Sequence, residues 1–141
     1  YSHGLKKHDG NCQRIVHGHR SKIEIFENHQ RNAELEDYWS ACFRNIYIGT
    51  EQDISKEFEL EGKPYITFSY QAAQGHFSVT LPKKRVYLID TDSTVELIAE
   101  HISVSYTHLR AHETSLHLVC RLLLAVVFGL KRDKQKDGFD K

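Results

Sequence analysis

The clearest pattern along the chain is the alternation of side chains over residues 17–27. The odd-numbered positions from His17 to Ile25 hold two histidines, a serine and two isoleucines, whereas Arg20, Lys22 and Glu24 occupy the even positions. Successive side chains of a strand point to opposite faces. The pattern therefore predicts a strand with both histidines at one end of its buried face.

The remaining periodicity predicts a mixture of helices and strands. Apolar residues at helical spacing, among them Leu35, Tyr38, Trp39, Cys42 and Phe43, predict a helix over residues 32–46 in which Cys42 is a core residue. Strands are predicted at the very start of the chain, over a hairpin and over one further segment: residues 1–3, 65–70, 76–81 and 85–89.

A second helix is expected after Asp92 and Ser93. Ser93 and Glu96 have the spacing of a capping box, with Val95, Ile98 and Ile102 on the inner face. Asp90 and Asp92 flank the end of a strand, where catalytic carboxylates often occur. Helix capping is nevertheless the favoured role for Asp92.

The histidines suggest metal chemistry. His17 and His19 should project together from the strand, and His3 lies upstream. Neutral imidazoles gathered in this way hold Zn²⁺ and leave one position open. Cys12 would then be placed to act as a nucleophile or base. The alternatives are a solvated His-x-His pair and, for Cys12, an inert buried thiol.

Other histidines are given simpler roles. The chain has ten in all. His8, His29 and His101 are expected to be exposed polar residues, and His76 an exposed residue at the hairpin edge.

Residues 104–124 resemble a translated adapter of short-read sequencing libraries. Residues 104–114 match one block of the adapter, and residues 118–124 match its continuation after a gap of index length. The resemblance predicts that the gene ends near Ser103 and that residues 104–141, with His108, His112 and His117, are a non-native tail.

Charge divides at the same place. Residues 1–103 hold 12 Lys+Arg and 15 Asp+Glu, a net of −3, whereas the tail holds 7 and 4, a net of +3. The apolar run over residues 118–130 is shorter than the about 20 residues of a membrane span. No basic block with interleaved aromatics favours nucleic acid as a partner.

What remains has the length of one small domain. It contains no Met, and no signal peptide opens it. The start within a strand predicts that residues are missing before Tyr1. Outside the tail only Cys12 and Cys42 remain, which favours a reduced, cytoplasmic setting.

One family combines these motifs. The segment from Tyr1 to Leu5, then Cys12, then His17-Gly18-His19, resembles the 6-pyruvoyltetrahydropterin synthase and 6-carboxytetrahydropterin synthase family. Thr94-Val95-Glu96 resembles the family's Pro-Thr-x-Glu helix start, with Ser93 where proline is usual. The resemblance implies an α+β tunnelling fold, with helices on one face of a four-stranded antiparallel sheet and several copies closing into a barrel. Here the fold would be incomplete at both ends.

The resemblance also implies an activity. His3, His17 and His19 would bind zinc, and Cys12 would be the catalytic thiol of a lyase. The expected reaction converts dihydroneopterin triphosphate to 6-carboxytetrahydropterin in queuosine and 7-deazapurine synthesis. The active sites would lie between the subunits of a homo-oligomer. Neither nucleic acid nor a membrane is expected as a partner.

Some family features are missing. The Asp-His pair that follows the first helix in the family has no counterpart in residues 46–51, and the hairpin over 65–81 looks like an insertion. The pterin-anchoring glutamate would fall beyond Ser103. The chain is therefore expected to be an inactive fragment, for which the second half of a two-unit protein is one hypothesis. The alternatives are a 6-pyruvoyltetrahydropterin synthase-type lyase and a non-catalytic zinc- or pterin-binding unit.

Overall fold

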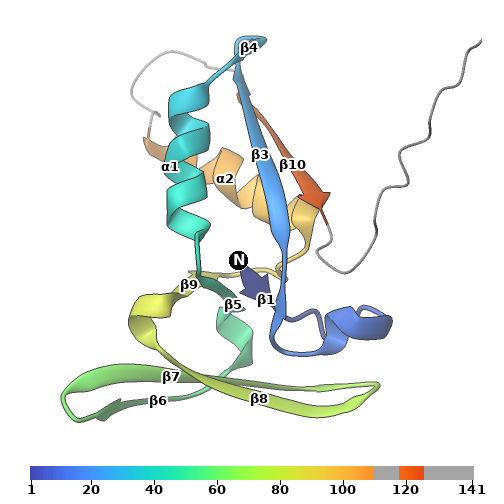
Figure 1. The fold of residues 1–141 in the computed structure, drawn as a ribbon, viewed down its shortest axis with the longest axis vertical. Coiled ribbons are helices and arrows are strands. Elements are labelled where there is room, and N and C mark those ends of the chain that lie inside the picture. The colour runs from blue at the N-terminus through green and yellow to red at the C-terminus, as the bar shows by residue number, and fades with distance from the viewer. Residues whose placement is uncertain (110–117, 126–141) are drawn as a thin grey trace, which may run out of the picture.

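A computed structural model describes residues 1–109 and 118–125 of the chain (Figure 1). The fold is a mixture of helices and strands, which confirms the α+β class. The helices are α1 (Ala33–Phe43) and α2 (Val95–Leu109), with short 3-10 turns at η1 (Gly10–Gln13), η2 (Glu51–Asp53) and η3 (Lys83–Arg85). The strands are β1 (Ser2–His3), β2 (His17–Gly18), β3 (Arg20–Glu27), β4 (Gln30–Arg31), β5 (Tyr47–Thr50), β6 (Ile54–Leu60), β7 (Lys63–Ala72), β8 (Gly75–Pro82), β9 (Val86–Ile89) and β10 (Leu118–Ala125).

The strands are divided among three sheets. A four-stranded sheet has the order β2-β1-β5-β9, and two three-stranded sheets have the orders β10-β3-β4 and β6-β7-β8. The four-stranded sheet is mixed, because β1 pairs antiparallel with β2 but β5 runs parallel to both β1 and β9. Parallel neighbouring strands need long crossover connections. The crossover connection from β5 to β9 contains the whole β6-β7-β8 sheet. The described strands form no closed barrel.

The strand predicted over residues 17–27 is present with a break. It divides at His19 into β2 and β3, and the odd positions are the buried ones as predicted, with Ile23 8% and Ile25 0% exposed. The predicted first helix begins after Asn32, whose side-chain oxygen accepts a hydrogen bond from the Leu35 amide at 3.0 Å. This is an N-cap, which supplies a partner for one of the unpaired amides of the first turn.

The helices also bring two corrections. The spacing places Tyr38 on the apolar face of α1, but it is 56% exposed, and Glu36 is buried in the same helix beside Trp39 and Phe43. The capping box at Ser93 is wrong, because Thr94 Oγ1 accepts from the Leu97 amide at 3.3 Å and so caps α2. Asp92 does not cap the helix either; its carboxylate lies 4.0 Å from Lys7 Nζ.

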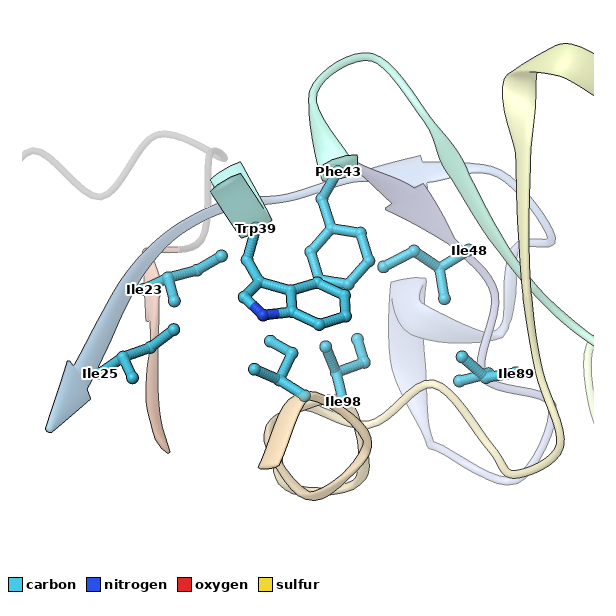
Figure 2. Close-up of a cluster of buried hydrophobic side chains, with 8 residues drawn as sticks. Ile23, Ile25, Trp39, Phe43, Ile48, Ile89 and Ile98 are labelled. Carbon is cyan, nitrogen blue, oxygen red and sulfur yellow. The ribbon is translucent and has the colours of Figure 1, made fainter. Parts of the chain in front are cut away.

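Two hydrophobic cores lie on opposite sides of β5. In the first, α1 and α2 pack their apolar faces together with β3 (Figure 2), and Trp39 lies among isoleucines from β3 and α2. Its buried members are Ile23, Ile25, Trp39, Phe43, Ile48, Ile89, Ile98 and Ile102. The second core forms under the β6-β7-β8 sheet from Ile15, Tyr47, Ile66, Phe68, Tyr70 and Ala72.

Strand β5 is shared by both cores. All four of its residues are buried, with Ile48 facing the first core and Tyr47 the second. Gly49 lies under the ring of Phe68, which occupies the space that a Cβ at Gly49 would need. Strand β5 was not predicted from the sequence, and neither was β6.

The C-terminal part continues past the predicted end of the gene. Helix α2 extends beyond Ser103 to Leu109, and β10 pairs antiparallel with β3 from Leu118 opposite Glu27 to Ala125 opposite Arg20. This pairing does not test the adapter origin of the segment, which stays a prediction. His112, His117 and the polar end of the tail lie outside the described residues. None of the helices described is long and apolar enough to cross a membrane.

Candidate metal centre

Three histidines meet where β1, β2 and β3 come together. His3 pairs directly opposite His17, and His19 is the residue between β2 and β3. The backbones of Tyr1 and His19 exchange two hydrogen bonds, at 2.8 Å from His19 N to Tyr1 O and 3.2 Å from Tyr1 N to His19 O. The short antiparallel pairing therefore brings all three imidazoles to one place.

The imidazoles are close enough to share one ion. Their ring centroids lie 4.4 to 4.6 Å apart. One nitrogen from each of His3, His17 and His19 lies within 4.8 Å of the other two. This grouping was predicted from the sequence, and these three residues could hold a metal ion.

In the part of the chain that the structure describes, the ring nitrogens at the centre have no hydrogen-bond partner. His3 and His19 are only 2% and 8% exposed. The buried atoms without a hydrogen bond are the Nε2 of all three rings and the Nδ1 of His19. A buried polar atom left unsatisfied costs about 1–3 kcal/mol. Bound metal would use such lone pairs, so the donor set fits a metal ion.

Two of the three rings are oriented through Nδ1. His17 Nδ1 lies 3.1 Å from the carbonyl oxygen of Arg14. A carbonyl only accepts, so Nδ1 of His17 carries the proton and its Nε2 keeps a lone pair. Nδ1 of His3 lies 2.9 Å from Ser93 Oγ. Nε2 is thus the nitrogen that both rings leave unbonded, at the centre of the cluster.

Electrostatics keep the rings neutral. Burial lowers the pKa of His3 to about 3, helped by repulsion from His17 and His19. Burial, with repulsion from His17, lowers the pKa of His19 to about 4. Burial also lowers the pKa of His17. Neutral imidazole is the form that binds metals.

Tyr1 covers one side of the centre. Its ring is stacked on His19 at 5.6 Å between centroids and meets the His3 ring edge-on at 5.2 Å. The Ser21 hydroxyl donates to the Tyr1 hydroxyl at 3.3 Å. The sequence-based reasoning missed both Tyr1 and Ser93 as neighbours of the site. Ser93 lies 90 residues from His3, and nothing in local spacing relates the two.

Cys12 lies apart from the histidine cluster. It is half-buried in η1, and in the described part of the chain the group of mutually close ligand atoms contains the three histidines without it. The amide of Leu5 donates to the Cys12 carbonyl at 2.8 Å, which attaches the η1 loop to the segment that follows β1, the strand of His3.

The hairpin holds the other side of the η1 loop. Tyr70 donates its hydroxyl to the Gln13 carbonyl at 2.5 Å, and the Gln74 amide donates to the Gln13 side chain at 3.0 Å. Gln13 itself is 3% exposed. The segment predicted to be an insertion thus fixes the loop that carries Cys12.

The other polar candidates are dispersed. His8, His29 and His76 are exposed, as predicted, and so is Asp90. His101 is half-buried and lies 2.8 Å from the Tyr87 hydroxyl, so the prediction of an exposed residue was wrong. The aromatic partner comes from β9, which the spacing of residues along α2 does not reveal.

A cavity of about 1150 Å³ lies beside the centre. Tyr1 and His19 form part of its wall, Phe43 and Ile46 supply apolar surface, and Arg44 supplies a cation. Small-molecule sites combine such apolar walls with a few polar groups.

Comparison with known proteins adds no relative. No protein-family profile, no curated protein and no solved structure matches this chain.

Proposed function

We propose that His3, His17 and His19 bind Zn²⁺. The observation that carries the proposal is the set of buried Nε2 atoms without partners at the centre of the cluster. A catalytic zinc site usually has three protein ligands and a fourth position that is left open. Three neutral imidazoles match this composition.

The family resemblance extends this to a reaction. We propose that the chain is a unit of a cytoplasmic 6-carboxytetrahydropterin synthase-like lyase that acts on dihydroneopterin triphosphate. The histidine set that the structure brings together is the set that the resemblance assigns to zinc. In this proposal several copies close into the barrel of the tunnelling fold, with sites between subunits.

The chain's own residues have defined tasks in this mechanism. Zinc, when bound, would polarise the side-chain oxygens of the pterin and acidify the adjacent C–H and O–H bonds. Cys12 would accept and return the proton at the pterin side chain. Arg44, and Arg20 on the same cavity, would attract the triphosphate.

A second candidate function is a non-catalytic zinc- or pterin-binding unit. Two observations favour it: Cys12 is outside the histidine cluster, and β5, where the family has its Asp-His pair, carries Tyr47, Ile48, Gly49 and Thr50. A 6-pyruvoyltetrahydropterin synthase-type lyase on the same site would differ only in its product.

Metal content tests the first part. The full chain, purified without chelator, is expected to contain about one zinc per chain, and His17→Ala is expected to remove it. His76→Ala is the matched control, because His76 is exposed on β8. Zinc binding that survives His17→Ala would contradict the assignment.

Turnover tests the second part, with the full gene product as the enzyme. Cys12→Ala is expected to abolish conversion of dihydroneopterin triphosphate and to leave the zinc content unchanged. Cys42→Ala, which alters a half-buried residue beside the first core, is the control. Pterin and zinc binding without turnover in the unmodified protein would establish the non-catalytic alternative, and chromatography of the product would separate the two lyases.

A further inference from the structure

Ser93 contacts the centre from a position 90 residues away from His3 in the sequence. Its hydroxyl oxygen lies 2.9 Å from Nδ1 of His3. Ser93 and His3 are 1% and 2% exposed, so water does not compete for this contact. Because Thr94 caps α2, the Ser93 hydroxyl is not used for capping.

The segment before α2 is held firmly enough to place this hydroxyl. Thr50 of β5 donates its hydroxyl to the Thr91 carbonyl at 3.0 Å. On the other side, the Ile98 amide donates to the Thr94 carbonyl at 2.9 Å in the first turn of α2. Ser93 is thus fixed between the central sheet and the helix.

We propose that Ser93 is a positioning residue for the metal centre. By accepting a hydrogen bond from Nδ1–H of His3, Ser93 holds the tautomer in which Nε2 is unprotonated. It also fixes the ring rotation, so that Nε2 faces His17 and His19. The inference rests on the proposed metal binding. It adds a residue that the family resemblance does not supply, because the family usually has proline at this position.

The comparison with His17 supports this role. Nδ1 of His17 contacts the Arg14 carbonyl, which can only accept, and Nδ1 of His3 contacts the Ser93 hydroxyl, which can accept in the same role. In both rings the Nε2 atom is buried and without a partner. Hydrogen bonds from the non-coordinating nitrogen orient metal-binding histidines, and their loss typically costs 10- to 100-fold in metal affinity.

The test compares Ser93→Ala with Ser103→Ala in the full chain. Ser103 lies within α2 and donates its hydroxyl to the Ala99 carbonyl, so the control deletes the same atom away from the histidine cluster. Zinc affinity is measured by competition with a chelator, and the visible spectrum of the Co²⁺-loaded chain reports the ligand geometry. Ser93→Ala is expected to weaken Zn²⁺ binding about 10- to 100-fold and to alter the Co²⁺ spectrum, whereas Ser103→Ala changes neither.

Zinc affinity within twofold of the unmodified chain, with an unchanged Co²⁺ spectrum, would overturn the inference while leaving the metal site intact. Imidazole ¹⁵N NMR of the metal-free, unmodified chain is an independent measurement that needs no variant. It is expected to show His3 with its proton on Nδ1. A proton on Nε2 would refute the positioning role, and failure of the unmodified chain to bind zinc would refute the proposed function instead.

Discussion

The two ends of β3 each lie beside a buried polar group, and the two groups are satisfied differently. At the Glu27 end, Glu36 is 7% exposed, and its carboxylate accepts from the Ile25 amide at 3.0 Å and from Arg31 Nε at 2.7 Å and Nη2 at 2.9 Å. At the His19 end, four buried imidazole nitrogens have no hydrogen-bond partner among the residues that the structure describes. The chain itself supplies the hydrogen-bond partners of Glu36, whereas the histidine cluster keeps nitrogens that could hold a metal ion.

The two groups also differ in the charge state that the fold favours. The hydrogen bonds from Arg31 lower the pKa of Glu36, so its charged form is favoured. Burial lowers the pKa of His3 and His19, so their neutral forms are favoured. Both groups are buried and polar, but Glu36 forms a charged pair with Arg31, whereas the histidines offer neutral nitrogens that could hold a metal ion.

Acidification of the metal-free chain should show the largest difference. The pKa of His3 is lowered to about 3, so the unfolded chain binds more protons than the native chain between pH 6.5 and pH 4. The free energy of unfolding therefore decreases as the pH is lowered. We expect a loss of about 3 kcal/mol over this range from His3 alone. Urea unfolding at several pH values measures it, and a flat profile above pH 5 would show that the histidines are solvated.

Disrupting the completed group should have the next largest effect. Glu36→Gln removes the charge from the hydrogen bonds with Arg31 and is expected to lower the free energy of unfolding by about 2 kcal/mol. Zinc affinity should remain unchanged, because Glu36 is at the opposite end of β3. Thermal unfolding and chelator competition measure the two quantities, and a large fall in zinc affinity would show that the two ends are coupled.

Replacing an unsatisfied ring should have a smaller effect of opposite sign. His19→Phe removes two unpartnered nitrogens and keeps a ring that stacks on Tyr1. We expect the metal-free chain to gain about 1 kcal/mol in stability, while zinc no longer raises its melting temperature. A variant that is less stable than the unmodified metal-free chain would mean that His19 contributes to packing.

Truncation should have the smallest effect on the site. A chain ending at Ser103 lacks β10, which pairs with β3, but retains the histidine cluster and Glu36. We expect the zinc affinity to stay within about twofold of that of the full chain. A twofold change corresponds to about 0.4 kcal/mol of binding free energy. A large loss of zinc binding would indicate that residues 104–141 belong to the functional protein.

The sequence allowed the histidine cluster to be predicted because two of its members, His17 and His19, are two residues apart in one extended segment. Period-two alternation places His17 and His19 on the same face, and the structure brings them together with His3. The orienting contacts could not be predicted in this way. Ser93 reaches His3 through the pairing of β5 with β9, a non-local contact that local spacing does not encode.

The fold was predicted in a similarly uneven manner. Helix α1, the hairpin β7-β8 and the buried positions of β3 follow from periodicity. Strand β5 does not, because it is buried on both faces and has no alternation in four residues. The mixed pairing of the four-stranded sheet depends on where β5 inserts, so the predicted antiparallel sheet did not follow.

The position of Gly49 has a consequence for how the protein opens. Phe68 of the second core rests on Gly49 of β5, and β5 also supplies Ile48 to the first core. Neither core can open without exposing the backbone of β5, so the two should unfold as one cooperative unit. Strand β1, which carries His3, pairs with β5. Amide hydrogen exchange in β7, a strand that carries none of the three histidines, should therefore slow when metal binds.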